Sequence, residues 1–140
     1  MATVERLITT ADVDDRSPDQ PYVSVRARHE AVLADGRRLL LLDDRGWASN
    51  QPWAALSPDD VEETARMVVG PDEPPPGRSR EEEEAGHWSH LAGTLQRHRV
   101  AVDARALRNL PHDVVLSERL LARIGRGPGS GRRPVLPVVE

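Results

Sequence analysis

The most regular pattern in the chain is an alternation of apolar and polar residues from Tyr22 to Leu33, which predicts a half-buried strand. One side of this strand is expected to face a core and the other to carry polar groups. The expected core-facing positions are Val23, Val25, Ala27, His29, Ala31 and Leu33.

A hairpin is predicted after this strand. Asp35-Gly36 lies between two strand-like runs and suits a type I′ turn, whose central residues need positive φ. Residues 38–42 are therefore expected to return as the antiparallel partner, and their four consecutive leucines predict that this strand is covered on both faces. The register implied by the turn pairs His29 with Leu42 and Arg28 with Asp43.

Two helices are predicted from capping signals and apolar spacing. Ser57-Pro58 begins the first, and Gly70-Pro71 ends it. Ser79 begins the second with Glu82 three residues later, as in a capping box, and the helix extends to about residue 99. Its apolar stripe, expected to pack on the hairpin leucines, consists of Trp88, Leu91, Ala92 and Leu95.

Shorter elements follow from local signals. Asp43 to Gly46 is predicted to form a turn, followed by a loop or short strand that carries Trp47 and Trp53. Residues 100–102 are a candidate third strand, and Asp103 can cap a short helix over 104–109. A last helix is expected over Val114 to Ile124, with Ser117 as an alternative, later start.

The chain is expected to form a single α+β domain over residues 22–124: a small antiparallel hairpin sheet of two or three strands covered by three or four helices. Residues 1–21, where acidic residues and prolines follow a few apolar positions, are expected to be a loosely held arm. Residues 125–140 are rich in Gly, Pro and Arg and are expected to be a flexible tail.

The composition removes several kinds of chemistry. With no cysteine there is no disulfide, thiolate or Cys-based metal site, and all 19 strong cations are arginines, so no lysine is present for a P-loop or a Schiff base. No cofactor is expected. The arginine-only composition favours a bacterial protein, and the lack of a long apolar run or a leader-like start favours the cytoplasm and no membrane.

The main candidates for catalytic or metal-ligating residues are the histidines of the second predicted helix. Glu84 and His87 have i,i+3 spacing suited to a metal, and His90 or His98 can add an imidazole. A single helix cannot complete a coordination sphere, so His29 or His112 would have to come from elsewhere in the fold. A metal- or histidine-dependent enzyme is therefore an alternative function.

The charge distribution suggests a second alternative. Residues 1–98 hold 11 Arg against 19 acidic residues, whereas residues 99–140 hold 8 Arg against 4. The acidic body argues against general nucleic-acid binding, but the basic C-terminal helices can serve a nucleic-acid-binding regulator through Arg119 and Arg123.

No coherent catalytic constellation is found, so the favoured function is a non-catalytic interaction or regulatory domain that binds another protein or itself. Trp and Arg are the side chains most often found as interface anchors. The predicted binding residues are Trp47, Trp53, Arg119 and Arg123.

Overall fold

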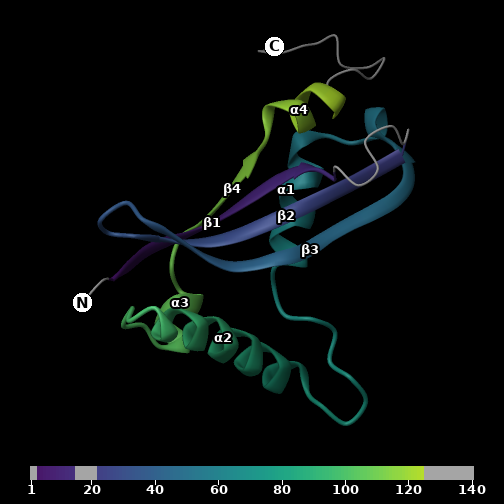
Figure 1. The fold of residues 1–140 in the computed structure, drawn as a ribbon. Coiled ribbons are helices and arrows are strands. Elements are labelled where there is room, and N and C mark those ends of the chain that lie inside the picture. The colour runs from purple at the N-terminus through teal and green to yellow at the C-terminus, as the bar shows by residue number, and fades with distance from the viewer. Residues whose placement is uncertain (1–2, 15–21, 125–140) are drawn as a thin grey trace.

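The computed structural model describes residues 3–14 and 22–124 and shows one four-stranded sheet with four α-helices in that part of the chain (Figure 1). The strand order is β3-β2-β1-β4, with β4 parallel to β1 and the other neighbours antiparallel. The predicted α+β class is confirmed, but the sheet is larger than expected and mixed. The elements are β1 (Val4–Val13), β2 (Tyr22–Leu33), β3 (Arg38–Pro52), the 3-10 turn η1 (Trp53–Ala55), α1 (Pro58–Val68), α2 (Arg80–Arg97), α3 (Ala104–Arg108), β4 (His112–Leu116) and α4 (Glu118–Ile124).

Helices cover the two ends of one sheet face, and each end has its own hydrophobic cluster. The lower cluster in Figure 1 packs α2 and α3 on Leu7 of β1 and Leu33 of β2. The upper cluster packs α1 and α4 on Ala11 of β1 and Val25 of β2. These four strand residues share one face because strand side chains alternate. Between the two clusters the same face carries polar side chains.

The helix predictions from local signals are confirmed. Ser57 caps α1 and Ser79 caps α2, each in a reciprocal capping box, and Asp103 caps α3. The predicted stripe of α2 is buried at Leu91, Ala92 and Leu95, where it meets the hairpin leucines in the lower cluster.

The hairpin forms with a different turn from the predicted type I′. Gly36 has φ of +91°, whereas Asp35 does not have positive φ, and the Gly36 amide donates to the Leu33 carbonyl. The loop therefore has three residues, which moves the register by one position. A bulge at Leu41 then restores the predicted pairing of His29 with Leu42. A second bulge, in which two β3 residues face Arg28, prevents the predicted pairing of Arg28 with Asp43.

β3 does not end at the predicted turn over Asp43 to Gly46 but continues to Pro52. Gly46 has a packing role there: a Cβ on it would lie 2.4 Å from the Val25 carbonyl oxygen of β2. The glycine is needed because the two backbones approach closely, and it does not mark a chain reversal.

Three other predictions need correction. The segment expected to be a loosely held arm contributes β1, which lies between β2 and β4; residues 15–21 lie outside the described part. The helix expected from Val114 does not begin there, because residues 112–116 form β4, and α4 starts after Ser117, the later of the two starts considered. Residues 100–102 form no strand. The predicted tail, 125–140, lies outside the described residues.

Candidate functional site

A buried polar cluster occupies the space between the two hydrophobic clusters. The Thr9 hydroxyl of β1 lies 2.8 Å from Nδ1 of His29 on β2 and 2.6 Å from Nε2 of His112 on β4. The two imidazole rings meet edge to face, with centroids 5.0 Å apart. Three strands thus contribute one residue each. Thr9 and His29 are almost fully buried, whereas His112 is partly exposed.

The surroundings of this cluster favour neutral imidazoles. Burial, reinforced by the neighbouring His112 and His87, lowers the pKa of His29 to about 3. Burial and the nearby Arg66 guanidinium also lower the pKa of His112, against the opposing effect of Asp113. A hydroxyl has one proton, so Thr9 can donate to one ring and accept from the N–H of the other. The cluster satisfies its buried polar atoms, but its inner members offer no surface to a substrate.

The histidines of α2 are not gathered into one site. His87 is half-buried against the edge of Trp88, and burial together with Arg45 lowers its pKa. His98 is the C-cap of the helix, and Glu84 accepts a hydrogen bond from Arg108. His90 is exposed. Within residues 3–14 and 22–124, no three His, Asp or Glu side chains are placed to hold a metal ion.

All four predicted binding residues make contacts within the upper part of the domain. Trp53 is 7% exposed, and the Arg123 guanidinium carbon lies 5.5 Å from the centroid of its ring, a cation–π contact. Trp47 is partly buried against the upper cluster and lines a surface hollow.

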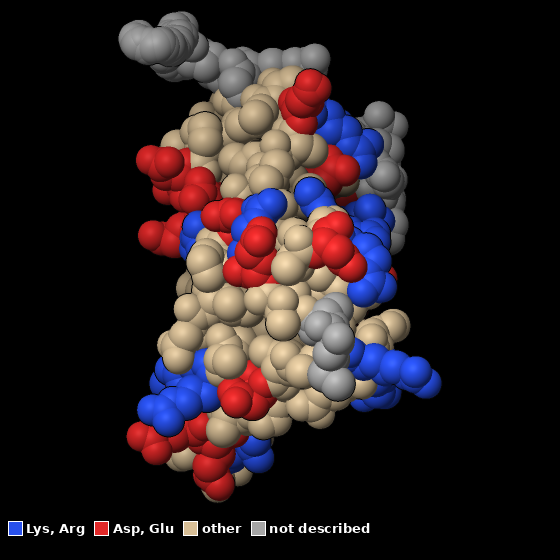
Figure 2. All heavy atoms as spheres, turned by 90° about the vertical axis from the view of Figure 1, so that its left-hand side faces the viewer, with Lys and Arg blue, Asp and Glu red and all other residues tan. Residues whose placement is uncertain are grey.

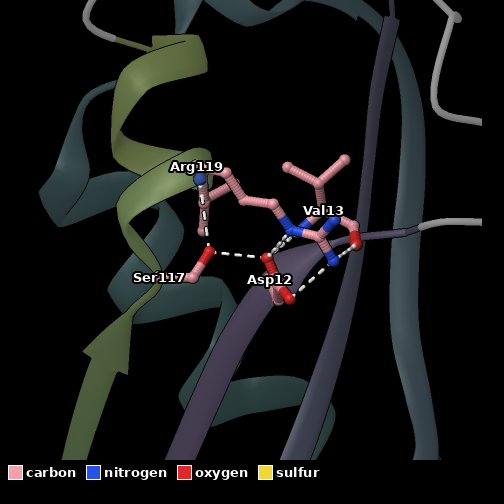
Figure 3. Close-up of polar contacts among 5 residues, drawn as sticks. Asp12, Val13, Ser117 and Arg119 are labelled. Atoms are coloured by element: carbon pink, nitrogen blue, oxygen red, sulfur yellow. Dashed lines mark hydrogen bonds and ion pairs between the residues drawn. The ribbon is translucent and has the colours of Figure 1, made fainter.

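Arg119 forms a bidentate pair with Asp12 that fastens α4 to β1 (Figure 3). The two N–O distances are 2.7 and 2.8 Å, and the Ser117 hydroxyl donates to the same carboxylate at 2.6 Å. The Arg119 hydrogen bonds, opposed by partial burial, lower the pKa of Asp12 to about 2. No local sequence signal marks Asp12, because its partner is more than a hundred residues away.

We expect Asp12→Asn and Arg119→Gln to be non-additive. Each single change should lower the free energy of unfolding. The loss in the double variant should be about 1 kcal/mol smaller than the sum of the two single losses, since the pair is bidentate but partly exposed to solvent. Urea denaturation of the four proteins at neutral pH measures this coupling. Fully additive losses would show that the contact contributes nothing.

The edge of the sheet at β3 is a second candidate site. β3 spans fifteen residues, and β2 is its one strand partner among the described residues. Two hollows share Asp44, Arg45 and Gly46 in their linings, so this stretch of β3 separates them. The first, of about 460 Å³, continues over β2 and also has Ser24, Arg26, Asp43 and Trp47 in its lining.

The second hollow, of about 430 Å³, continues toward the C-terminal end of α1 and is lined there by Met67, Val68, Pro71, Asp72 and Glu73. Sequence reasoning identified Trp47 but neither hollow. Their walls together come from four separate stretches of the chain, and the only local signal was the Asp43 to Gly46 run, which resembled a turn.

Charge is mixed on the face shown in Figure 2, where arginines and carboxylates lie next to each other across the described residues. Ion pairs between the described strands include Arg6 of β1 with Asp113 of β4, 2.7 Å apart. Among the helices of the described segments, none has the length and apolar character required to cross a membrane.

The chain was compared with protein-family models, with curated protein sequences and with solved structures. None of the three comparisons gave a match.

Proposed function

We propose that the protein is a non-catalytic interaction domain that binds an extended segment of another protein along the outer edge of β3. The observation that carries this proposal is the fifteen-residue β3 at the edge of the sheet, with no strand on its outer side in the described part of the chain. An added strand gains affinity from main-chain hydrogen bonds along such an edge.

The two hollows beside β3 support this mode of binding. Successive side chains of an added strand point to opposite faces of the sheet, so neighbouring residues of the partner would enter different hollows. Asp44, Arg45 and Gly46 lie between them and would face the middle of the bound segment.

The other two functions have less support. The enzyme alternative depends on the histidines of α2, but His87 is half-buried, His90 is exposed and His98 is the C-cap of the helix. Arg119, one of the two arginines of the nucleic-acid alternative, is committed to Asp12. The opposite edge strand, β4, is shorter, and Arg66 donates to its His112 carbonyl at 2.6 Å. We place the interaction in a bacterial cytoplasm on composition alone.

Hydrogen exchange of the complex tests the proposal. A partner is captured from native lysate and purified with the protein, and amide exchange is compared with that of the unbound protein. We expect exchange to slow along residues 38–52 and to stay unchanged along β4 (112–116), because an added strand would use the outer amides of β3. Protection confined to another surface, or a protein that remains a lone monomer, would refute strand addition at β3.

A further inference from the structure

We propose that the bound segment carries a lysine or arginine whose side chain enters the 430 Å³ hollow between β3 and the end of α1. This inference rests on the proposed strand addition and specifies the chemistry of the partner. The hollow combines an acidic rim with an apolar wall, which is the combination that a long cationic side chain matches.

The rim of the hollow has an excess of negative charge. Its acidic members are Asp44, Asp72 and Glu73, whereas Arg45 is the one cation of the lining. Arg45 contacts Asp72 at 2.8 Å, Asp44 at 3.7 Å and the Val68 carbonyl at 3.4 Å, so its charge is already shared among neighbours. An exposed contact of 3.8 Å joins Glu73 to Arg80, which lies outside the lining.

The wall of the hollow gives the stem of the side chain a surface to pack on. Met67 is 68% exposed, an unusual degree of exposure for a large apolar residue, and Val68 and Pro71 extend the same wall. The flexible thioether of methionine adapts to aliphatic chains. A lysine or arginine can therefore cover Met67 with its methylene groups while its charged end reaches the carboxylates.

The hollow on the other side of β3 does not have the same preference. Its lining has three acidic residues, Asp14, Asp43 and Asp44, against the two arginines Arg26 and Arg45, so its excess of negative charge is smaller than that of the hollow beside α1. A basic residue is therefore expected at the partner position that faces α1, with no such requirement at the positions before and after it.

Three synthetic peptides test this inference. They share an alternating Thr/Val sequence and differ only at the central residue, which is Lys, Gln or Glu. Binding is followed through the backbone amide shifts of the isotope-labelled protein. We expect the Lys peptide to bind roughly threefold to tenfold more tightly than the Gln peptide, as solvent-screened ion pairs allow, and the Glu peptide to bind most weakly. Raising the salt concentration should reduce these differences.

A charge-neutral variant of the hollow provides the control. Asp44→Asn with Glu73→Gln should remove the preference for the Lys peptide over the Gln peptide. Asp59→Asn with Glu63→Gln, on exposed positions of α1, changes the net charge equally and should keep the preference. Equal binding of all three peptides with β3 shifts would overturn the basic-residue inference alone. The absence of any β3 shift with all three would overturn strand addition as well.

Discussion

Replacing Gly46 by alanine is expected to lower the free energy of unfolding by about 3 kcal/mol, because the added methyl group would overlap the neighbouring strand. The new Cβ would lie 2.4 Å from the Val25 carbonyl oxygen and 3.3 Å from the Arg26 Cα. Both are backbone atoms of the paired strand β2, so they cannot move aside as a flexible side chain would. The strands must separate locally, and the ladder between them weakens.

Gly93→Ala is the matched control for this change. Gly93 lies inside α2, and a Cβ there would meet nothing within 4 Å. Alanine should stabilise this helix by about 0.5–1 kcal/mol, because glycine loses more backbone freedom on folding. Urea denaturation compares the two variants with the parent protein. Equal stability of the Gly46→Ala variant and the parent would mean that β2 and β3 can move apart without cost.

Lowering the pH from about 6.5 to 4 is expected to destabilise the protein by up to roughly 1.4 kcal/mol per pH unit through His29 alone. The pKa of His29 is about 3 in the folded protein because the ring is buried, against an ordinary value of 6.5. Below pH 6.5 the unfolded chain therefore binds a proton that the folded chain does not, so the free energy of unfolding decreases as the pH is lowered. The lowered pKa values of His112 and His87 act in the same direction. Protonation of Asp12 lowers the free energy of unfolding further only below about pH 3.8.

The stability of the His29→Gln variant should depend less on pH, since glutamine does not titrate. Between pH 6.5 and 4 the variant should take up about one proton fewer on unfolding than the parent protein. Denaturant midpoints measured at several pH values give the slope. Leu95→Ala provides a destabilised control, because it opens a cavity in the lower cluster and leaves the Thr9, His29 and His112 contacts in place. Its slope should match that of the parent protein. An unchanged slope in His29→Gln would show that His29 is not the responsible group.

Elements specified by nearby residues could be predicted from the sequence, and elements specified by distant contacts could not. The helix starts at Ser57, Ser79 and Asp103 depend on hydrogen bonds that span three residues, so the capping pattern was enough. β1 was missed because Thr9 interrupts its core-facing apolar positions, Leu7, Ala11 and Val13. Thr9 is tolerated inside the sheet only because two histidines reach it from other strands.

The same reasoning explains the mixed result for candidate residues. Trp47 was identified from its type alone, and the structure places it beside a hollow. Arg119 of α4 was identified in the same way, but its partner Asp12 is on β1, and no local pattern joins them. The hollow beside Met67 depends on how α1 and the residues after it lie beside β3. No pattern in one stretch of sequence encodes that relation.

Because a polar cluster separates the two hydrophobic clusters, the two ends of the sheet can unfold locally and independently. Helices α2 and α3 belong to the lower cluster, and α1 and α4 belong to the upper cluster. The two clusters are connected through the strands that contribute residues to both. The proline-rich residues 71–77 do not form a helix, so α1 and α2 are not continuous with each other. Separate packing units of this kind open in separate local unfolding events. Release of α2 and α3 is thus expected to leave the upper apolar cluster, with α1 and α4, in place.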